Sequence, residues 1–464
     1  MKTRDLLELG TPLGDALKRA TEFIADFVLA GGDKSTIADE VSRVLNDPNL
    51  FVDDPMRGAF ARAVVEAPKP PRKEPAPYEQ WGKDLDEQAI DQMENACRLP
   101  VSVAGALMPD AHLGYGLPIG GVLATDNAII PYAVGVDIAC RMRMTVFDLP
   151  VQHLEKKQER LIAALERETR FGIGASFKER RDHEVMDDDW SVTPVTRRFR
   201  DKAWSQLGTS GSGNHFVEFG SYTVEADTEE LTSGVYLALL SHSGSRGVGA
   251  QVCSHYSRIA KDLNSELPKE LIHLAWLDLD SEPGAEYWAG MELMGRYAAA
   301  NHACIHRHIT ENLGAEVLFG LENHHNFAWK ETHLIEGEAR NVIVHRKGAT
   351  PAGAGVMGII PGSMATPGFV VRGKGNSASL ESASHGAGRV MSRKKASAKF
   401  NWKDVNRQLR ERGVNLLSAG LDEAPGVYKD IHEVMDAQTD LVEIVGRFDP
   451  KLVKMAPAGE RPED

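Results

Sequence analysis

Hydrophobic and polar positions follow two different patterns on either side of a Pro-rich segment. In residues 1–66, apolar residues recur at helical spacing in LGDALKRATEFIADFVLAG and TIADEVSRVL, which predicts an N-terminal helical extension. Five prolines between Pro68 and Pro77 then interrupt the chain. Because proline-rich segments are extended, residues 67–80 are predicted to be a linker.

From Trp81 onward, short β-branched segments bounded by glycine alternate with longer amphipathic stretches. We predict strands that end in loops at IIPYAVGVDIA, RMTVFDL, GVYLALLSHSG and RNVIVHRKGA. An apolar stripe at helical spacing predicts a long helix over residues 285–312. No internal repeat is evident, so residues 81–464 are expected to form one large α+β catalytic domain.

Charge and composition exclude several classes of protein. The chain has 464 residues and a formal net charge of −14, which argues against coating nucleic acid by bulk electrostatics. Four widely separated cysteines without a CxxC pair indicate neither a zinc ribbon nor a disulfide framework. No signal peptide and no apolar run of ~18 residues is seen, so we expect a cytoplasmic protein that does not enter membranes.

One local stretch is strongly basic despite the negative net charge. RVMSRKKASAKFNWK contains Arg389, Arg393, Lys394, Lys395, Lys399 and Lys403. It could form a basic groove for nucleic acid, or it could be the solvated face of a helix. The sequence alone does not decide between the two.

Residues able to bind metals lie in short motifs where strands give way to loops. GVDIAC contains Asp137 and Cys140, GSGNHFVE contains His215, SHSGSRG contains His242, and ENHHNF contains a histidine pair. Oxygen, nitrogen and sulfur ligands together favour Zn, Mn, Fe or Co over Mg or Ca, and a thiolate can bridge two ions. Taken singly, each histidine could instead be structural and Cys140 a small buried hydrophobe.

The pair His324 and His325 is ambiguous, because adjacent side chains on a strand point to opposite faces. At most one of them is expected to reach a given metal.

Gly-rich loops accompany these motifs. IIPGSM, GAGR and GTSGSGN could expose backbone N–H groups to an anion, or could be ordinary turns. None is a Walker or Rossmann motif. In SHGAGR, small residues surround His385, which could be a nucleophile, a metal ligand or a buried structural histidine.

The motifs resemble those of the RtcB family of GTP-dependent RNA-splicing ligases, in the family's order and over about four-fifths of the chain. The resemblance is carried by MPDAHLGYGLPIGG, AIIPYAVGVDIAC, GSGNHFVE, HSGSRGVG, HHNF, RKGA, GIIPGSM, SHGAGRVMSR and EAPGVYKDIHEVMDAQTDLVEI. It implies an α+β, RtcB-like fold with a central dinuclear metal pocket. It also implies joining of RNA 2′,3′-cyclic phosphate or 3′-phosphate ends to 5′-hydroxyl ends through a histidine-GMP intermediate, with GTP and two Mn²⁺ ions or other divalent metals.

By the same resemblance, His385 is the expected nucleophile. The expected metal ligands are Asp137, Cys140 and His215 for one ion, and Cys140, His242 and His325 for the other. The expected nucleotide pocket comprises Asn214, His215, Phe216, Val217, Glu218, His325, Asn326, Pro361, Gly362, Ser363, Met364, His385, Gly386, Ala387, Gly388 and Lys454, with Glu218 reading the guanine edge. An archease-like activator could assist, and the oligomeric state stays open.

The chain departs from the family pattern at several positions. Ala139 and Arg141 replace glycines beside the metal thiolate, Tyr115 replaces a lysine, Gly368 a serine and His302 an arginine. We expect the charge changes at Arg141 and Tyr115 to fall near RNA phosphates, which favours a divergent paralogue. Alternative functions are an RNA 3′-phosphate guanylyltransferase, a metal-dependent cyclic phosphodiesterase without ligation, and a non-catalytic RNA-end binder.

Overall fold

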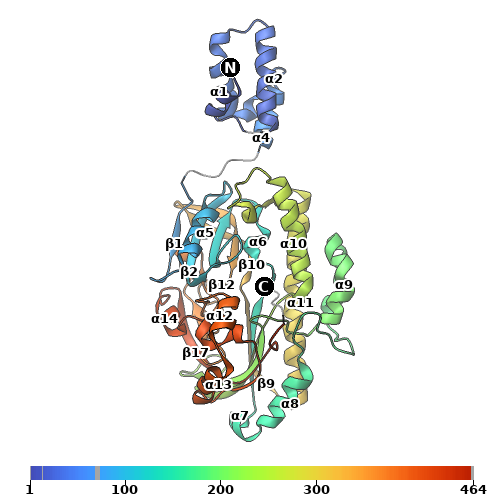
Figure 1. The fold of residues 1–464 in the computed structure, drawn as a ribbon, viewed down its shortest axis with the longest axis vertical. Coiled ribbons are helices and arrows are strands. Elements are labelled where there is room, and N and C mark those ends of the chain that lie inside the picture. Colours follow the sequence, from blue (N-terminus) through green and yellow to red (C-terminus); the bar gives the residue numbers. More distant parts are fainter. Residues whose placement is uncertain (1, 13, 68–73, 461–464) are drawn as a thin grey trace. The chain divides into compact units, whose positions relative to one another are not determined.

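A computed structural model describes residues 2–12, 14–67 and 74–460. By its internal contacts the chain divides into two compact units, Met1–Lys73 and Glu74–Asp464 (Figure 1). Each unit is described by itself below. None of the described helices is both long enough and apolar enough to span a membrane.

The first unit consists of the helices predicted for residues 1–66. They are α1 (Thr3–Glu8), α2 (Asp15–Leu29), α3 (Ile37–Asn46) and α4 (Gly58–Glu66). Ala16, Ala20 and Phe23 form the buried stripe of α2, at the spacing of a single helical face. Phe23 stacks on Phe60 of α4 with ring centroids 5.9 Å apart, so the unit has a small core of its own.

The segment predicted to be a linker lies partly outside the described residues, at 68–73. Strand β1 (Tyr78–Gln80) also falls within that segment, and it pairs in parallel with β2 (Ser102–His112) of the second unit. Its three residues therefore belong to a sheet.

Two main sheets form the framework of residues 74–460. The larger is eight-stranded: seven strands in the order β13 (Met357–Ile360), β14 (Gly368–Gly373), β17 (Val442–Met455), β6 (Phe216–Val224), β7 (Gly234–Ser243), β5 (Arg141–Phe147) and β9 (Val317–His324), with β16 (Asn415–Ser418) beside β17. The smaller has the order β1, β2, β3 (Ile119–Thr125), β11 (Glu338–Lys347) and β10 (Asn326–Ile335). Two short ladders pair β12 (Ala349–Pro351) with β15 (Ser382–Ser384), and β4 (Ala128–Ile129) with β8 (Leu277–Asp278).

Two long helices, α10 (Arg246–Leu263) and α11 (Glu282–Leu313), run side by side next to the sheets (Figure 1). Helix α11 covers the helix predicted over 285–312. Ser281 caps its start by accepting a hydrogen bond from the Gly284 N–H, and Gly314 ends it in the left-handed conformation. The other helices of this unit are α5 (Glu87–Cys97), α6 (Pro131–Val134), α7 (His153–Lys156), α8 (Gln158–Glu168), α9 (Pro194–Gln206), α12 (Arg393–Lys399), α13 (Trp402–Glu411) and α14 (Ile431–Asp436).

One of the predicted strands is wrong over most of its length. In IIPYAVGVDIA only Ile129 belongs to a strand, and residues 131–134 form the short helix α6. Pro131 at the first turn favours helical backbone, and Gly135, with a φ of 106°, ends the turn. The apolar residues of this segment are buried because it packs inside the domain, so they do not indicate a strand.

Strand pairing brings the motifs together. Strand β5 begins directly after Cys140 and lies between β7 and β9, so that Met142 is opposite both His242 and Asn323. Strand β6 pairs with the other edge of β7 and places Phe216 opposite His242. The motif residues near these strand ends therefore gather at one end of the large sheet, where these strands begin or finish.

Candidate active site

A cavity of about 680 Å³ opens at this end of the large sheet, and the motif loops line it. Of the residues expected to bind metal or nucleotide, those that line it are Asp137, Cys140, Asn214, His215, Phe216, Glu218, His242, His325, Asn326, Pro361, Gly362, Ser363, Met364, His385, Gly386, Ala387 and Gly388. Segments from 137 to 388 along the chain thus meet around one space.

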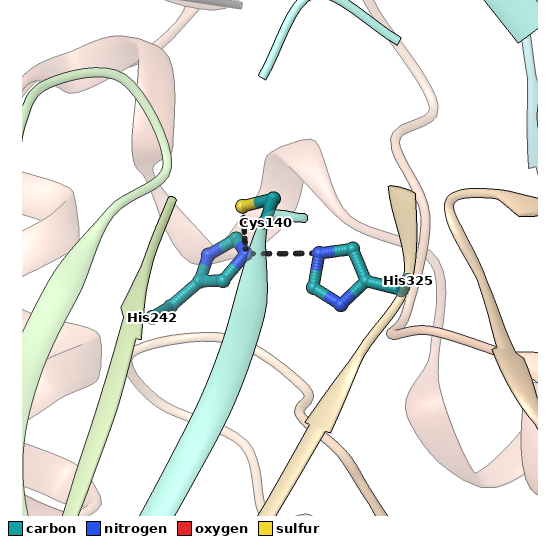
Figure 2. Close-up of side chains that lie close together, drawn as sticks. All are labelled: Cys140, His242 and His325. Carbon is teal, nitrogen blue, oxygen red and sulfur yellow. Dashed lines mark hydrogen bonds between the residues drawn. The ribbon is translucent and has the colours of Figure 1, made fainter. Parts of the chain in front are cut away.

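Two groups of buried side chains in the cavity have the composition of metal sites. One comprises Asp137, Cys140 and His215, and the other Cys140, His242 and His325. The Cys140 Sγ lies 3.4 Å from the His215 Nε2 and 3.0 Å from the His242 Nε2. Figure 2 shows Cys140, His242 and His325 converging, with the two histidine Nε2 atoms 3.2 Å apart. Because Cys140 belongs to both groups, its sulfur is the atom that could bridge two ions.

The local backbone orients the ligands of the first group. Cys140 donates its N–H to the Asp137 carbonyl at 3.2 Å, which closes the turn that carries both side chains. The Asp137 carboxylate lies 3.1 Å from the His215 Nε2 and accepts the Ser245 N–H at 3.0 Å. Gly244 permits this approach, because a Cβ there would lie 2.0 Å from the carboxylate.

Burial and neighbouring groups shift the pKa values of three of these side chains. Burial, reinforced by the neighbouring His215, lowers the pKa of His242 to about 3. Burial also holds the pKa of His325 well below its usual value. For Asp137, burial acts to raise the pKa, but the hydrogen bond and charge of His215 outweigh it and the net pKa lies below the usual value. Neutral imidazoles and an ionised carboxylate are the forms that bind metal.

This donor set fits the metal ions that the family resemblance implies. One carboxylate, one cysteine sulfur and three imidazoles favour divalent transition ions over Mg²⁺ or Ca²⁺. The outward-facing Nδ1 of His242 lies 3.1 Å from the Asn214 carbonyl, which orients that ring.

His385 lies beside the second donor group. Its ring centroid is 4.9 Å from that of His325, and its Nδ1 is 2.7 Å from the Asp110 Oδ2. The Asp110 side chain is fully buried. Burial acts to raise the pKa of Asp110, but the hydrogen bond to His385 outweighs it and the net pKa is lowered. An ionised carboxylate can only accept, so the His385 Nδ1 carries a proton, and in a neutral imidazole the lone pair is then on Nε2.

Asp110 was not singled out from the sequence, although MPDAH is part of one of the motifs. Its carboxylate also accepts the backbone N–H groups of His385 and Gly386, at 3.2 and 3.3 Å. The available signal was a single aspartate within the largely apolar run SVAGALMPDAH. A buried acid in a strand requires a partner, and His385 is that partner.

Close backbone contacts explain one glycine of the SHGAGR loop. Gly388 has a φ of 72°, and a Cβ there would lie 2.1 Å from the Asp110 carbonyl oxygen. The loop that carries His385 therefore packs directly against the strand that carries Asp110. Any larger residue at position 388 would push the His385 loop away from the Asp110 strand.

Glu218 lines the same cavity and has an unusual environment. Only 5% of the residue is exposed, and burial raises the pKa of its carboxyl to about 8.

Two residues expected in the nucleotide pocket do not line the cavity. Val217 points into the core between β6 and α8, as strand alternation requires. The Lys454 Nζ lies 2.9 Å from the Glu166 Oε2, outside the lining residues.

Arg141 points away from the cavity, and its expected place near RNA phosphates stays a prediction. Its side chain is 7% exposed, does not line the cavity, and contacts Glu322 and the Gly295 carbonyl at 3.3 Å each. Cys140 and Arg141 are adjacent, so they lie on opposite sides of the backbone. His324 likewise turns away from the cavity and lies 5.1 Å from the Trp329 ring, whereas His325 faces inward.

Other departures from the family pattern do lie at the site. Ala139 has a φ of 57°, a left-handed conformation that a glycine adopts without strain. Its N–H donates to the Asn326 carbonyl at 2.7 Å, which helps to hold it there. Tyr115 and Gly368 both line the cavity, and His302 is buried away from it.

The chain is similar to known proteins of one family. A family model described as "tRNA-splicing ligase RtcB" matches residues 92–193 and 181–455. The chain is 32% identical over 450 residues to the tRNA-splicing ligase RtcB of Methanococcus maripaludis, covering 81% of this chain and 92% of that protein. It is 32% identical over 404 residues to the RNA-splicing ligase RtcB of Escherichia coli (strain K12), covering 80% and 95%. An RNA-splicing ligase RtcB homolog 2 of Entamoeba dispar is 30% identical over 483 residues, covering 89% and 90%.

Proposed function

The chain belongs to the RtcB family, and from this premise we propose that it is an RNA ligase that acts through a guanylate bound covalently to His385. Its substrates are RNA ends that carry a 2′,3′-cyclic phosphate or 3′-phosphate, and RNA ends that carry a 5′-hydroxyl. The observation that carries the proposal is the Asp110–His385 pair beside two candidate metal groups.

In the first step, the His385 Nε2 attacks the α-phosphate of GTP. A P–N bond forms, the bond to the β-phosphate oxygen breaks, and pyrophosphate leaves. Asp110 holds the proton on Nδ1, so that Nε2 is the nucleophile, and it stabilises the positive charge that develops on the ring. A buried carboxylate that fixes the tautomer of a reacting histidine in this way recurs in enzymes of unrelated fold.

In the later steps, a 3′-phosphate oxygen of the RNA takes the guanylate from His385. A cyclic phosphate is first hydrolysed to the 3′-phosphate. The 5′-hydroxyl then attacks the activated phosphate, a phosphodiester bond forms, and GMP leaves. His385 is regenerated with its Nε2 lone pair free.

Asp137, Cys140, His215, His242 and His325 would hold the two Mn²⁺ ions or other divalent metals. Bound there, the ions would neutralise phosphate charge and lower the cost of bringing anions together.

The nucleotide would occupy the remainder of the cavity. The Gly-containing loops Pro361–Met364 and His385–Gly388 line the same space, where they would receive its phosphates. Glu218 would accept hydrogen bonds from the guanine edge once ionised. Lys454 stays a prediction, because contact with a base requires its ammonium to leave Glu166.

Mass spectrometry of the intact protein tests the covalent step. Wild-type protein incubated with GTP and Mn²⁺ should gain the mass of one GMP, and His385→Ala should gain none. His432→Ala is the matched control, because His432 is exposed and lies outside the cavity. Wild-type protein that binds Mn²⁺ yet never gains the mass would contradict the proposal.

Ligation is distinguished from the alternative functions by its products. The protein is incubated with GTP, Mn²⁺ and RNAs that end in 2′,3′-cyclic phosphate, 3′-phosphate or 3′-hydroxyl, together with a 5′-hydroxyl strand. Joined product supports a ligase, capped but unjoined RNA a guanylyltransferase, and opened cyclic phosphate alone a phosphodiesterase. A non-catalytic binder is disfavoured, because it needs neither a shared thiolate nor an oriented histidine.

We also propose a cytoplasmic location, because a reducing compartment keeps the Cys140 thiolate available. All four cysteines are buried. We further propose that an archease-like activator assists the reaction. Adding such a protein to the ligation assay should then increase the rate of turnover.

A further inference from the structure

Tyr115 stands out on the rim of the cavity. It is 66% exposed, and among the described Phe, Trp and Tyr residues it is the one that is exposed to this degree. Its neighbour Leu113 is 50% exposed and lines the same rim. An exposed ring at the mouth of a binding cavity is a candidate contact for a ligand that enters it.

The backbone beneath Tyr115 is held in place while the ring stays exposed. The Lys347 ammonium donates to the Tyr115 carbonyl. The Gln92 side chain accepts the Gly114 N–H at 3.0 Å and donates to the Gly114 carbonyl at 2.7 Å. Gly116 has a φ of 73° and passes so close to His273 that a Cβ would lie 2.8 Å from the His273 carbonyl oxygen. Because the loop is anchored on both sides of Tyr115, the residue is preorganised, and less conformational entropy is lost when a ligand binds.

Other rings continue the surface behind Tyr115. The His273 ring lies 6.3 Å from the Tyr115 ring, and the Tyr132 ring lies 5.3 Å from His273 in an edge contact. The Lys261 ammonium lies 4.9 Å from the centroid of the Tyr132 ring and 3.2 Å from the His273 Nδ1. Partial burial and this nearby lysine lower the pKa of His273, which favours the neutral, stackable imidazole.

This surface is close to the proposed nucleophile. Lys347, which binds the Tyr115 carbonyl, is followed by Gly348, where a Cβ would lie 3.1 Å from the His385 Cε1. One lysine side chain therefore separates the Tyr115 backbone from the neighbourhood of His385. A nucleotide near a reacting RNA end could reach Tyr115.

We propose that Tyr115, backed by His273, is a stacking site for an unpaired nucleobase of the RNA next to the reacting end. This inference rests on the proposed function. Nucleobases present a π-face that stacks on tyrosine whatever the sequence, and each such contact contributes about 1–3 kcal/mol. The site makes the enzyme prefer RNA ends whose terminal nucleotides are unpaired.

Fluorescence of 2-aminopurine tests the site directly. Full-length protein is titrated, without GTP, into single-stranded RNAs that end in a 3′-phosphate and carry 2-aminopurine at one of the last four positions. Stacking on Tyr115 should quench the probe at one position, and Tyr115→Ala should abolish that quenching and weaken binding about 5- to 100-fold. Tyr115→Phe keeps the ring and should behave like wild type.

Two controls separate stacking from other causes. Leu113→Ala removes an exposed apolar side chain from the same loop and should leave the quenching unchanged. With a blunt duplex end, where no base is unpaired, Tyr115→Ala should bind as wild type does. Thermal unfolding midpoints verify that each variant is folded.

Several outcomes would overturn the proposal. The first is an affinity for RNA in Tyr115→Ala that equals that of wild type. The second is a loss of affinity in Tyr115→Phe as large as in Tyr115→Ala. The third is a loss of affinity in Tyr115→Ala that is equal for blunt and unpaired RNA ends. Failure of the proposed function is distinguishable, because wild-type protein would then gain no GMP mass. Failure of the stacking site alone leaves that adduct intact and leaves the joining of unpaired ends insensitive to Tyr115→Ala.

Discussion

At the scale of single residues, the chemistry depends on how Asp110 and His385 are paired. A histidine is a nucleophile only through a nitrogen that lacks a proton, and the buried carboxylate determines which nitrogen that is. The two backbone N–H groups that Asp110 also accepts keep the carboxylate and the histidine loop in one position. Asp110 is therefore a positioning residue, because it acts through His385.

Asp110→Asn should slow formation of the GMP adduct by a factor on the order of 10²–10⁴. The asparagine amide can donate to Nδ1, which would place the ring proton on Nε2 and remove the attacking lone pair. The same oxygen, Oδ2, accepts the His385 ring and the backbone N–H groups of His385 and Gly386, so an amide nitrogen in its place also removes the acceptor of those two N–H groups. The rate is measured by single-turnover mass spectrometry with GTP and Mn²⁺.

The metal content of Asp110→Asn should match that of wild type, whereas its unfolding midpoint should be lower because two buried N–H groups lose their acceptor. A wild-type rate of adduct formation in this variant would show that Asp110 does not determine the tautomer.

Glu218 predicts a pH-dependent stability. Its folded-state pKa of about 8 lies above the reference value of 4.5. The favourable contribution of the protonated acid is thus complete below pH 4.5 and is lost as the pH rises through 8, at about 1.4 kcal/mol per pH unit at most. Glu218→Gln removes this titration. The unfolding midpoint of the variant, measured relative to that of wild type, should therefore increase as the pH rises from 5 to 8.5.

The matched control is Glu225→Gln, since Glu225 follows the same strand but is exposed. Its midpoint should run parallel to wild type at every pH. A Glu218→Gln curve that also runs parallel would mean that the carboxyl titrates normally.

At the scale of elements, the candidate ligands lie where strands end. Cys140 precedes β5, His242 is near the end of β7, and His325 follows β9. Hydrogen bonding between these strands fixes the separation of the ligands, whereas the turns provide the donor atoms. A metal bound there would connect three neighbouring strands.

Mn²⁺ should therefore stabilise the fold. Adding Mn²⁺ at about 100 times its Kd to chelator-treated protein should contribute about 2.7 kcal/mol and raise the unfolding midpoint by a few degrees. Cys140→Ser should lose most of this rise, because the sulfur belongs to both donor groups. Differential scanning fluorimetry measures the shift.

Cys253→Ser is the control, because Cys253 is buried in α10 outside the donor groups. It should keep the Mn²⁺-dependent rise even if its own midpoint is lower. Equal rises in Cys140→Ser and wild type would place the metal elsewhere.

At the scale of the whole molecule, the chain combines a small helical unit with a large one that carries the site. The core of the first unit is formed by residues between Leu6 and Val64, and the family match begins at residue 92. The expected division into 1–66, 67–80 and 81–464 stays a prediction, although the contacts divide the chain at Lys73 and Glu74.

Deleting residues 1–73 should leave the large unit folded. Because each unit has its own core, residues 74–464 should unfold cooperatively near the wild-type midpoint and form the GMP adduct at a similar rate. Circular dichroism and the mass assay measure both properties. Loss of the adduct in a folded variant would assign the helical unit a part in the reaction.

The sequence by itself determined the helices of the extension, the long helix over 285–312 and the motifs that carry the chemistry. These features are local, because helical periodicity, caps and Gly-rich turns are set by residues close together in the chain. The same holds for the pairing of Asp137 with Cys140 on one turn. The resemblance to a family then supplied expected roles for residues that composition and spacing had left open.

Only the tertiary structure decided how distant residues meet and which way adjacent side chains face. Asp110 and His385 are 275 residues apart, so their contact depends on how the strand and the loop that carry them pack. Arg141 turns away from the cavity and Lys454 turns toward Glu166 because strand partners set the direction of each side chain. A pattern along the chain specifies residue types, whereas only long-range pairing specifies which of them share a cavity.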